Sequence, residues 1–354
     1  MISQTLEHPG AFVQVDSDIP RAAPGELVLK MAAVTVCGSD VRIYTGEKTG
    51  SVVWPVTIGH EFTGRIHEIG EGLGDRFQTG ELCAIVPWVS CGDCRACRTG
   101  STNLCAALRI FGYQIPGGLS EYIRIPAEAV TGGNVVPLPA DLDPALGALA
   151  EPLACVLNGH LRSNISVGDS VLILGAGPIG MLHAQLARAA GASQVIVSEP
   201  NADRAAAIRE FGATHTIDPT QGDAVELVQA ITGPDGADVS IICVGIPALV
   251  DIATAATRAG GVVNLFAGFG GDGSGTIKLN VPHYRQQQLI GNAGSTVQLY
   301  RRAAELISSG AVSVGEMVTH RYPLSRAEEA LQFAASGAGT KVAIVPDSAM
   351  GPNG

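Results

Sequence analysis

Positive charge is scarce in this chain of 354 residues, which has 22 lysines and arginines against 33 acidic residues and a net charge of −11. A general nucleic-acid-binding surface needs clustered basic residues to neutralise phosphates, so this composition argues against nucleic acid as a partner. Charged residues of both signs amount to only 16%, whereas hydrophobic residues reach 46%. We therefore expect an ordered protein that buries substantial cores and is long enough for two domains.

The chain also lacks an uninterrupted apolar run long enough to span a membrane. Its most apolar region, Val171 to Val197, is broken by glycines, a proline and polar side chains such as His183, Gln185 and Arg188. The opening residues MISQTLEHPG contain neither a basic leader nor an apolar stretch. We therefore expect no signal peptide, no membrane partner and a cytoplasmic location. In a reducing cytosol, the eight cysteines favour metal binding over disulfides.

Two patterns divide the sequence. Residues 1–147 contain short β-like runs separated by glycine and proline, which predicts an irregular β-rich domain. Over residues 148–289 apolar strands alternate with helical patterns, including an expected helix over 247–260. This alternation predicts an α/β domain, a doubly wound parallel sheet with helices on both faces. Residues 290–354 add two expected helices and a final strand, KVAIVP.

Four cysteines form the pattern C-x2-C-x2-C-x7-C: Cys91, Cys94, Cys97 and Cys105. This spacing lets neighbouring thiolates converge on one ion, and four sulfurs complete a closed tetrahedral zinc site. The bacterial ferredoxin run instead has three residues before its last cysteine and a proline after it, so zinc is favoured over an iron–sulfur cluster or a redox site. Because four sulfurs leave no open position, the predicted role is structural.

A glycine-rich turn, Gly175-Ala176-Gly177-Pro178-Ile179-Gly180, follows the apolar strand VLIL and precedes an expected helix. In this context it predicts a dinucleotide site, because glycines let the backbone approach the pyrophosphate at a helix N-terminus. Glu199 ends the next strand, where it can bind the ribose hydroxyls and repel a 2′-phosphate. Glu199 therefore favours NAD over NADP, and the nearby Arg204 weakens that preference. Three positions that end later strands are further candidates for cofactor contact, with core packing as the alternative for the first two: Val244, Phe266 and Gly268.

A second set of candidate metal ligands is dispersed along the chain. GHEFTG places His60 and Glu61 side by side, Cys37 lies 23 residues before His60, and Glu151 lies in LAEPLACV. Imidazole, thiolate and carboxylate together suit a catalytic zinc, which keeps one position open for water or substrate. Each residue also has an ordinary explanation, such as a buried thiol or surface charge, so spacing alone leaves this second site open.

Taken together, these motifs resemble the zinc-dependent medium-chain alcohol and polyol dehydrogenases, in the branch of the sorbitol (L-iditol) and threonine dehydrogenases. The stretches that carry the resemblance occur in that family's order across nearly the whole chain: CGSD, GHEFTG, CGDCRACRTGSTNLC, GGLSEY, AEPLACV, GAGPIG and GTKVAIV. The resemblance implies a GroES-like catalytic domain formed by residues 1–147 and 290–354. It also implies a Rossmann NAD-binding domain inserted at 148–289, and a homodimer or homotetramer.

The resemblance also implies the residues of the reaction. It makes Cys37 and His60 ligands of a catalytic zinc and offers Glu61 or Glu151 as the acidic ligand. The zinc would acidify the substrate alcohol, Ser39 would take its proton, and NAD would accept the hydride.

This chain departs from the family at the residue that would pass the substrate's proton on to solvent. Many members carry histidine where this chain has Arg42, and an arginine stays protonated and cannot relay a proton. We therefore predict a shorter relay from Ser39 through the cofactor ribose and water, with Arg42 contacting the cofactor or an anionic group of the substrate. Asp40 is expected to cap a helix and not to act as a base.

The expected substrate is a secondary alcohol, most simply a polyol or sugar alcohol, because the polyol branch carries glutamate at the position of Glu151. An apolar secondary alcohol, a threonine-type amino alcohol and a phosphorylated polyol are the alternative substrates. A non-catalytic NAD-binding regulator is the alternative of a different class. The presence of all four candidate ligands, Cys37, His60, Glu61 and Glu151, argues against the regulator.

Overall fold

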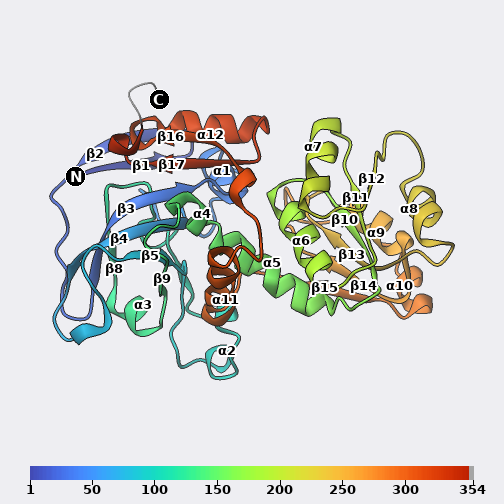
Figure 1. The fold of residues 1–354 in the computed structure, drawn as a ribbon, viewed down its shortest axis with the longest axis horizontal. Helices are drawn as coiled ribbons and strands as arrows, with labels where there is room; N and C mark the ends of the chain where they lie inside the picture. Colours follow the sequence, from blue (N-terminus) through green and yellow to red (C-terminus); the bar gives the residue numbers. More distant parts are fainter. Residues whose placement is uncertain (351–354) are drawn as a thin grey trace. The chain divides into compact units, whose positions relative to one another are not determined.

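The structure, a computed structural model, describes residues 1–350 (Figure 1). The chain divides into two compact units. Met1–Ala154 and the chain from Gly294 onward form the first, which we call the discontinuous unit, and Cys155–Ala293 form the second, the inserted unit. None of the helices within residues 1–350 is long and apolar enough to cross a bilayer.

A seven-stranded sheet organises the discontinuous unit. The strand order is β16-β17-β3-β4-β5-β9, and β8 pairs with another part of β3. β17 comes from the far end of the chain yet pairs antiparallel with β3, with Ala343 opposite Thr35. Segments distant in sequence therefore complete one sheet. Its strands are β3 (Leu27–Thr35), β4 (Glu61–Ile69), β5 (Leu82–Ile85), β8 (Tyr122–Ile125), β9 (Val135–Pro137), β16 (Val318–Pro323) and β17 (Lys341–Val345).

The core of this unit forms where strand residues meet the last helix. Leu29 on β3, Phe62 on β4 and Ile344 on β17 belong to one cluster of buried side chains, to which Leu331 of α12 also contributes. Burying a side chain of this size stabilises the fold by about 1.5–3 kcal/mol. The other elements are β1 (Ile2–His8), β2 (Ala11–Asp16), α1 (Gly38–Tyr44), β6 (Trp88–Val89), α2 (Arg95–Arg98), β7 (Arg109–Ile110), α3 (Ala127–Thr131), α4 (Pro144–Ala148), α11 (Val297–Ser308) and α12 (Ala327–Ser336), while α5 (Ala150–Ser163) continues into the inserted unit.

The inserted unit contains a six-stranded sheet in which every strand runs parallel to its neighbours, in the order β12-β11-β10-β13-β14-β15. The central strand β10 reads SVLIL and is buried throughout, as expected for a parallel strand covered on both faces. This confirms the predicted α/β parallel sheet. The strands are β10 (Ser170–Leu174), β11 (Gln194–Ser198), β12 (His215–Ile217), β13 (Ala237–Ile242), β14 (Thr257–Leu265) and β15 (Gln288–Gly291).

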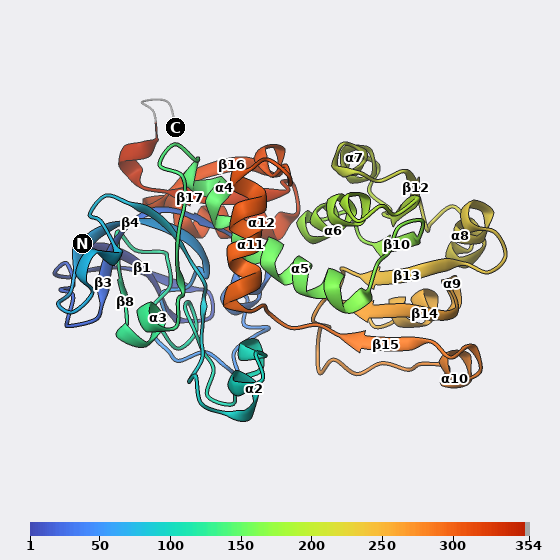
Figure 2. The ribbon, with the colours of Figure 1, turned by 60° about the horizontal axis from the view of Figure 1, so that its bottom comes forward.

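Helices connect these strands, and one of them is shorter than the sequence suggested. The helix expected over 247–260 ends at Ala256, and β14 begins at the next residue. The Thr257 backbone N–H and hydroxyl both donate to the Ala253 carbonyl, so Thr257 caps the last helical turn while its backbone is already extended. The helices are α6 (Pro178–Ala189), α7 (Ala202–Ala207), α8 (Ala224–Thr232), α9 (Leu249–Ala256) and α10 (Asn280–Arg285). Figure 2 shows β15 as the outermost strand, next to β14.

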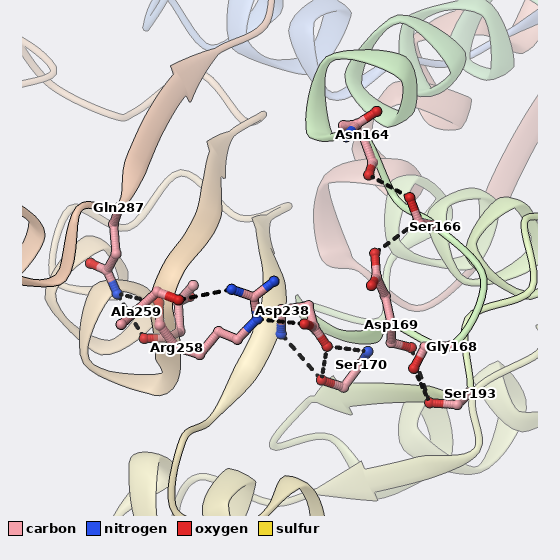
Figure 3. Close-up of polar contacts among 11 residues, drawn as sticks. Asn164, Ser166, Gly168, Asp169, Ser170, Ser193, Asp238, Arg258, Ala259 and Gln287 are labelled. Atoms are coloured by element: carbon pink, nitrogen blue, oxygen red, sulfur yellow. Dashed lines mark hydrogen bonds and ion pairs between the residues drawn. The ribbon is translucent and has the colours of Figure 1, made fainter.

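A polar network holds the amino ends of β10 and β13 together (Figure 3). The Asp238 carboxylate accepts hydrogen bonds from the Ser170 backbone N–H at 2.8 Å and the Ser170 hydroxyl at 2.7 Å. Arg258 Nε donates to the other carboxylate oxygen at 2.5 Å. Polar contacts thus hold the strands together at this end of the sheet. The glycine turn follows the opposite, carboxyl end of β10.

Candidate active site

The stretch CGSD forms the start of helix α1 in the discontinuous unit. Cys37 occupies the N-cap position with an extended backbone, and its N–H donates to the Asp40 carboxylate at 2.9 Å. The predicted capping role of Asp40 is confirmed. The cap fixes the backbone at Cys37 and so sets the direction of its thiol.

Asp40 has a second role that sequence reasoning missed. Its other oxygen lies 3.2 Å from His60 Nδ1 and 3.3 Å from the Gly59 N–H. Burial opposes ionisation of Asp40, but His60 and the Cys37 N–H outweigh it and lower its pKa below the ordinary value. An ionised Asp40 holds the proton of His60 on Nδ1 and leaves Nε2 free to act as a ligand.

Three of the predicted catalytic ligands converge. The ligand atoms of Cys37, His60 and Glu61 lie within 4.8 Å of one another. Glu61 is fully buried at the start of β4, and His60 is 6% exposed. Ser39 Oγ lies 3.5 Å from His60 Nε2, so the predicted proton acceptor is next to this cluster.

A buried lysine compensates the charge of Glu61. Lys341 Nζ lies 2.5 and 2.7 Å from the two Glu61 oxygens and donates to the Val36 carbonyl at 3.0 Å, while the Thr35 hydroxyl also donates to Glu61. Burial disfavours the charged form of Lys341, yet Glu61 outweighs it and the pKa of Lys341 is raised. Sequence reasoning missed this pair, although a single lysine heading the buried strand KVAIV was a visible signal.

Glu151 lies in the first turn of α5 and is 5% exposed. Its negative charge also raises the pKa of Lys341. Within residues 1–350, the acid whose carboxylate converges with the ligand atoms of Cys37 and His60 is Glu61.

The four cysteines of the C-x2-C-x2-C-x7-C pattern form a second cluster of candidate metal ligands. The sulfur atoms of Cys91, Cys94, Cys97 and Cys105 lie within 4.8 Å of one another, with 3.5 Å between those of Cys94 and Cys97. The Cys94 N–H points to the Cys91 sulfur at 3.4 Å, and the Cys91 N–H points to the Cys105 sulfur at 3.3 Å. Backbone N–H groups of Cys97 and Ala106 lower the pKa of Cys94 to about 6. The cluster therefore presents converging sulfurs, with N–H groups that favour the thiolate form of Cys94, the form required of a metal ligand.

In the inserted unit, the glycine turn has the backbone that close approach requires. Gly175 has φ of +110°, and a Cβ on Gly180 would lie 2.0 Å from the Gly175 oxygen. A Cβ on Gly177 would meet nothing within 4 Å, so the turn is open at that residue. Pro178 and Ile179 then begin α6. This is the arrangement in which a helix N-terminus can receive a pyrophosphate.

Glu199 lies beside this turn. One of its oxygens accepts the Ala176 N–H at 2.9 Å and the other accepts the Asn201 N–H at 3.0 Å. Arg204 Nε lies 3.5 Å from Glu199, whose side chain is buried whereas that of Arg204 is 46% exposed. The structure thus brings together the acid and the arginine that sequence reasoning weighed for cofactor choice.

The three later candidates differ in their surroundings. Val244 is exposed and follows β13, Gly268 is exposed, and Phe266 is half-buried with its ring edge-to-face against His183 at 4.7 Å. Phe266 therefore has the packing contact that was the alternative to cofactor binding, whereas Val244 remains accessible at the carboxyl edge of the sheet.

Comparison with known proteins agrees with both units. Residues 23–139 match the model of the alcohol dehydrogenase GroES-like domain, and residues 178–309 match that of the zinc-binding dehydrogenases. The chain is 30% identical over 347 residues to an L-threonine 3-dehydrogenase of Bacillus subtilis, covering 96% of this chain and 97% of that protein. It is 33% identical to a sorbitol dehydrogenase of Bombyx mori, covering 92% and 93% of the two chains.

A solved structure from Sinorhizobium meliloti 1021, named for a zinc-binding dehydrogenase and bound to NADP, superposes with a TM-score of 0.91 at 35% identity, covering 98% and 99% of the two chains. The chain belongs to the zinc-dependent alcohol dehydrogenase family. It is a dehydrogenase with a GroES-like domain and a Rossmann domain that uses zinc and a nicotinamide dinucleotide.

The residues present in this alcohol dehydrogenase fit the two metals that its family implies. Four converging cysteine sulfurs suit a closed structural zinc. Thiolate, imidazole and carboxylate at Cys37, His60 and Glu61 suit a zinc that keeps an open position.

Proposed function

We propose that this dehydrogenase oxidises a secondary alcohol of a polyol or sugar alcohol to a ketone and transfers the hydride to NAD. The observation that carries the proposal is the convergence of Cys37, His60 and Glu61 within 4.8 Å, with Ser39 Oγ 3.5 Å from His60 Nε2. Thiolate, imidazole and carboxylate are held beside a hydroxyl, which is what alcohol activation at an open zinc site requires.

Each residue of this cluster has a proposed role. Cys37 and His60 hold the catalytic zinc, with Glu61 or Glu151 as the acidic ligand. When bound, the zinc supplies Lewis acidity that makes the substrate hydroxyl a stronger acid. Ser39 Oγ receives the hydroxyl proton, and Asp40 keeps His60 in the tautomer that leaves Nε2 for the metal.

The ion pair of Lys341 with Glu61 bears on which acid, Glu61 or Glu151, would bind the zinc. Its ammonium is bonded to both oxygens of Glu61, so Glu61 is already charge-compensated without a metal. Removing one member of a buried ion pair costs about 3–5 kcal/mol, which ties Glu61 to Lys341. We propose that Glu61 would exchange Lys341 for the metal, and that Glu151 would be the acidic ligand while Glu61 is paired with Lys341.

The choice of NAD rests on Glu199 in the inserted unit, whose cofactor site we assign to the glycine turn, Glu199, Arg204 and Val244. A buried carboxylate fixed by two backbone N–H groups can bind ribose hydroxyls and opposes a 2′-phosphate. Arg204 lies 3.5 Å away and offsets part of that charge, and one similar structure holds NADP. We therefore propose NAD as the preferred cofactor, with measurable use of NADP.

The proposed substrate class rests on Glu151. We propose a polyol because glutamate at this position is typical of the polyol branch, and sorbitol dehydrogenases are among the similar proteins. A threonine-type amino alcohol is the second candidate, because a threonine dehydrogenase matches the chain over 96% of its length. We also propose a homodimer or homotetramer, the assembly that the family resemblance implies, and a cytoplasmic location, in keeping with eight cysteines that form no disulfide.

A spectrophotometric assay of NADH formation tests the proposal. Zinc-loaded protein is screened against polyols, sugars, apolar secondary alcohols and threonine, with NAD and then with NADP. We expect turnover of at least one polyol with NAD, and loss of that turnover in Cys37→Ser while NADH binding survives. Cys83→Ala, which removes a buried thiol on β5, is the matched control and should retain turnover. Normal turnover by zinc-loaded Cys37→Ser would contradict the assignment.

A further inference from the structure

Lys48 and the proposed zinc ligand His60 both contact the aromatic ring of Tyr113. Lys48 Nζ donates to the Tyr113 hydroxyl at 2.9 Å and lies 4.9 Å from the centre of that ring. The Tyr113 ring in turn packs edge-to-face against His60, with centroids 5.9 Å apart. Tyr113 is only 4% exposed, so it is a fixed support for the ammonium group.

The loop after α1 places Lys48 there. Ser39 and Arg42 lie three residues apart on α1 and therefore share a face of the helix. The Lys48 N–H donates to the Arg42 carbonyl at 2.9 Å, which folds the loop back against the end of α1. One continuous segment thus carries the proposed proton acceptor Ser39 and presents Lys48 to Tyr113, whose ring packs against His60.

The two cations of this segment are not equivalent. Arg42 Nε lies 3.7 Å from a Glu47 carboxylate oxygen, so a neighbouring acid offsets its charge. Within residues 1–350, no ion pair joins Lys48 to a carboxylate, and its hydrogen bond is to a neutral hydroxyl. An ammonium has three N–H donors, so after the bond to Tyr113 two donors remain for another acceptor.

Lysine is rare in this chain, which makes its placement informative. The sequence contains four: Lys30, Lys48, Lys278 and Lys341. Lys30 and Lys278 are exposed, and Lys341 is paired with Glu61. Lys48 is therefore the half-buried lysine whose charge is left without an acidic partner in the described residues.

We propose that Lys48 binds an anionic group of the substrate, so that the enzyme prefers polyols that carry a phosphate or carboxylate over neutral polyols. This inference rests on the proposed function and assigns the anion to Lys48 in place of Arg42. A neutral polyol offers hydroxyls, which neutral hydrogen-bonding groups match. An uncompensated ammonium near the reacting centre is matched by an anionic oxygen, in a charge-assisted hydrogen bond.

The test compares Lys48→Met with wild type on three sets of substrates. They are polyol phosphates, aldonic acids and the neutral polyols of the same chain length, each assayed for kcat and KM with zinc-loaded enzyme. Wild type should have the higher kcat/KM on one anionic set, and the better of the two identifies the anion as phosphate or carboxylate. Lys48→Met should lower kcat/KM on that set by about 10- to 100-fold, equivalent to about 1.4–2.7 kcal/mol, mainly through KM. Neutral polyols should change by less than about threefold.

Two further variants and a binding readout complete the design. Lys48→Arg keeps the charge and should restore the preference for the anion, while Lys30→Met removes an exposed lysine on β3 and should change nothing. The anionic substrate without cofactor should raise the melting temperature of wild type but not of Lys48→Met, provided that both hold equal zinc.

Contrary outcomes fall into two kinds. Equal losses of kcat/KM on anionic and neutral polyols, or a wild-type preference for neutral polyols, would overturn the role of Lys48 and leave the proposed function standing. Absence of any alcohol oxidation by zinc-loaded wild type with NAD or NADP would overturn the proposed function, and with it this inference.

Discussion

His183 is a fully buried imidazole on α6. Neither ring nitrogen has a hydrogen-bond partner within residues 1–350, and the ring packs edge-to-face against Phe266. Burial, followed by the charge of His160, lowers the pKa of His183 to about 3. His160 is half-buried, and burial lowers its pKa as well. The inserted unit therefore folds around imidazoles that must stay neutral.

Because folded His183 resists protonation, we expect the stability of the inserted unit to fall in acid. A histidine in the unfolded chain has a pKa of about 6.5, so below that pH the unfolded state binds a proton that folded His183 does not. Stability then falls as pH drops from about 6.5 towards 3. Between pH 7 and pH 5 we expect His183 to contribute a loss of about 2 kcal/mol. The measurement is the free energy of unfolding in urea at both pH values.

The variant His183→Leu should lose less stability between those pH values than wild type, by about 2 kcal/mol. His283→Leu removes an exposed histidine of the same unit and serves as the control. An unchanged pH dependence in His183→Leu would show that His183 is not the acid-sensitive group.

Strands β10 and β13 depend on the Asp238 network at their amino ends. Burial opposes ionisation of Asp238, but Ser170 and Arg258 outweigh it and lower its pKa. Asp238→Ala would leave the Ser170 N–H and the Arg258 guanidinium without their acceptor. We expect a loss of about 1–3 kcal/mol in the free energy of unfolding, measured in urea at pH 7. Asp235→Ala, at an exposed turn just before β13, should cost less than about 0.5 kcal/mol.

The elements that local sequence specifies were predicted, and those that depend on neighbours were not. SVLIL is apolar throughout and is flanked by glycine turns, so a buried parallel strand was the natural interpretation. The end of α9 could not be found in the same way, because a threonine hydroxyl replaces the usual helix-ending glycine. The edge strand β15 reads QLIG, which is too short and mixed to stand out from a loop.

For the candidate site too, features set by local sequence were predicted and those set by distant neighbours were not. The candidate ligands were predicted because the family motifs lie in contiguous stretches, such as GHEFTG and the cysteine loop. The pairs Asp40–His60, Lys48–Tyr113 and Glu61–Lys341 join residues 20, 65 and 280 positions apart. Such pairs follow from strand register and loop closure in three dimensions, which one sequence without tertiary contacts does not reveal.

At the scale of the whole molecule, we expect zinc binding to depend on the discontinuous unit and NADH binding to depend on the inserted unit. All eight proposed zinc ligands lie in Met1–Ala154, whereas the glycine turn and Glu199 lie in Cys155–Ala293, which has its own apolar core. We expect wild type to hold two zinc ions per chain by elemental analysis, and Cys37→Ser and Cys94→Ser to hold one each. Cys94→Ser should lower the melting temperature, because a structural zinc site contributes directly to folding.

Both variants should still bind NADH with wild-type affinity, measured by cofactor fluorescence. Gly180→Val, whose side chain would collide with the Gly175 oxygen, is the control that should lose NADH binding and keep two zinc ions. Loss of NADH binding in Cys94→Ser would show that the two units do not fold independently.

The ion pair between Glu61 and Lys341 also constrains how the protein is made. The two residues are 280 positions apart, so a ribosome adding about 5–20 residues per second synthesises them roughly 14–56 s apart. During that interval every strand of the inserted unit emerges, while the sheet of the discontinuous unit still lacks β17. We expect the inserted unit to mature first on the ribosome, with the Glu61 carboxylate left exposed to solvent until translation is nearly complete.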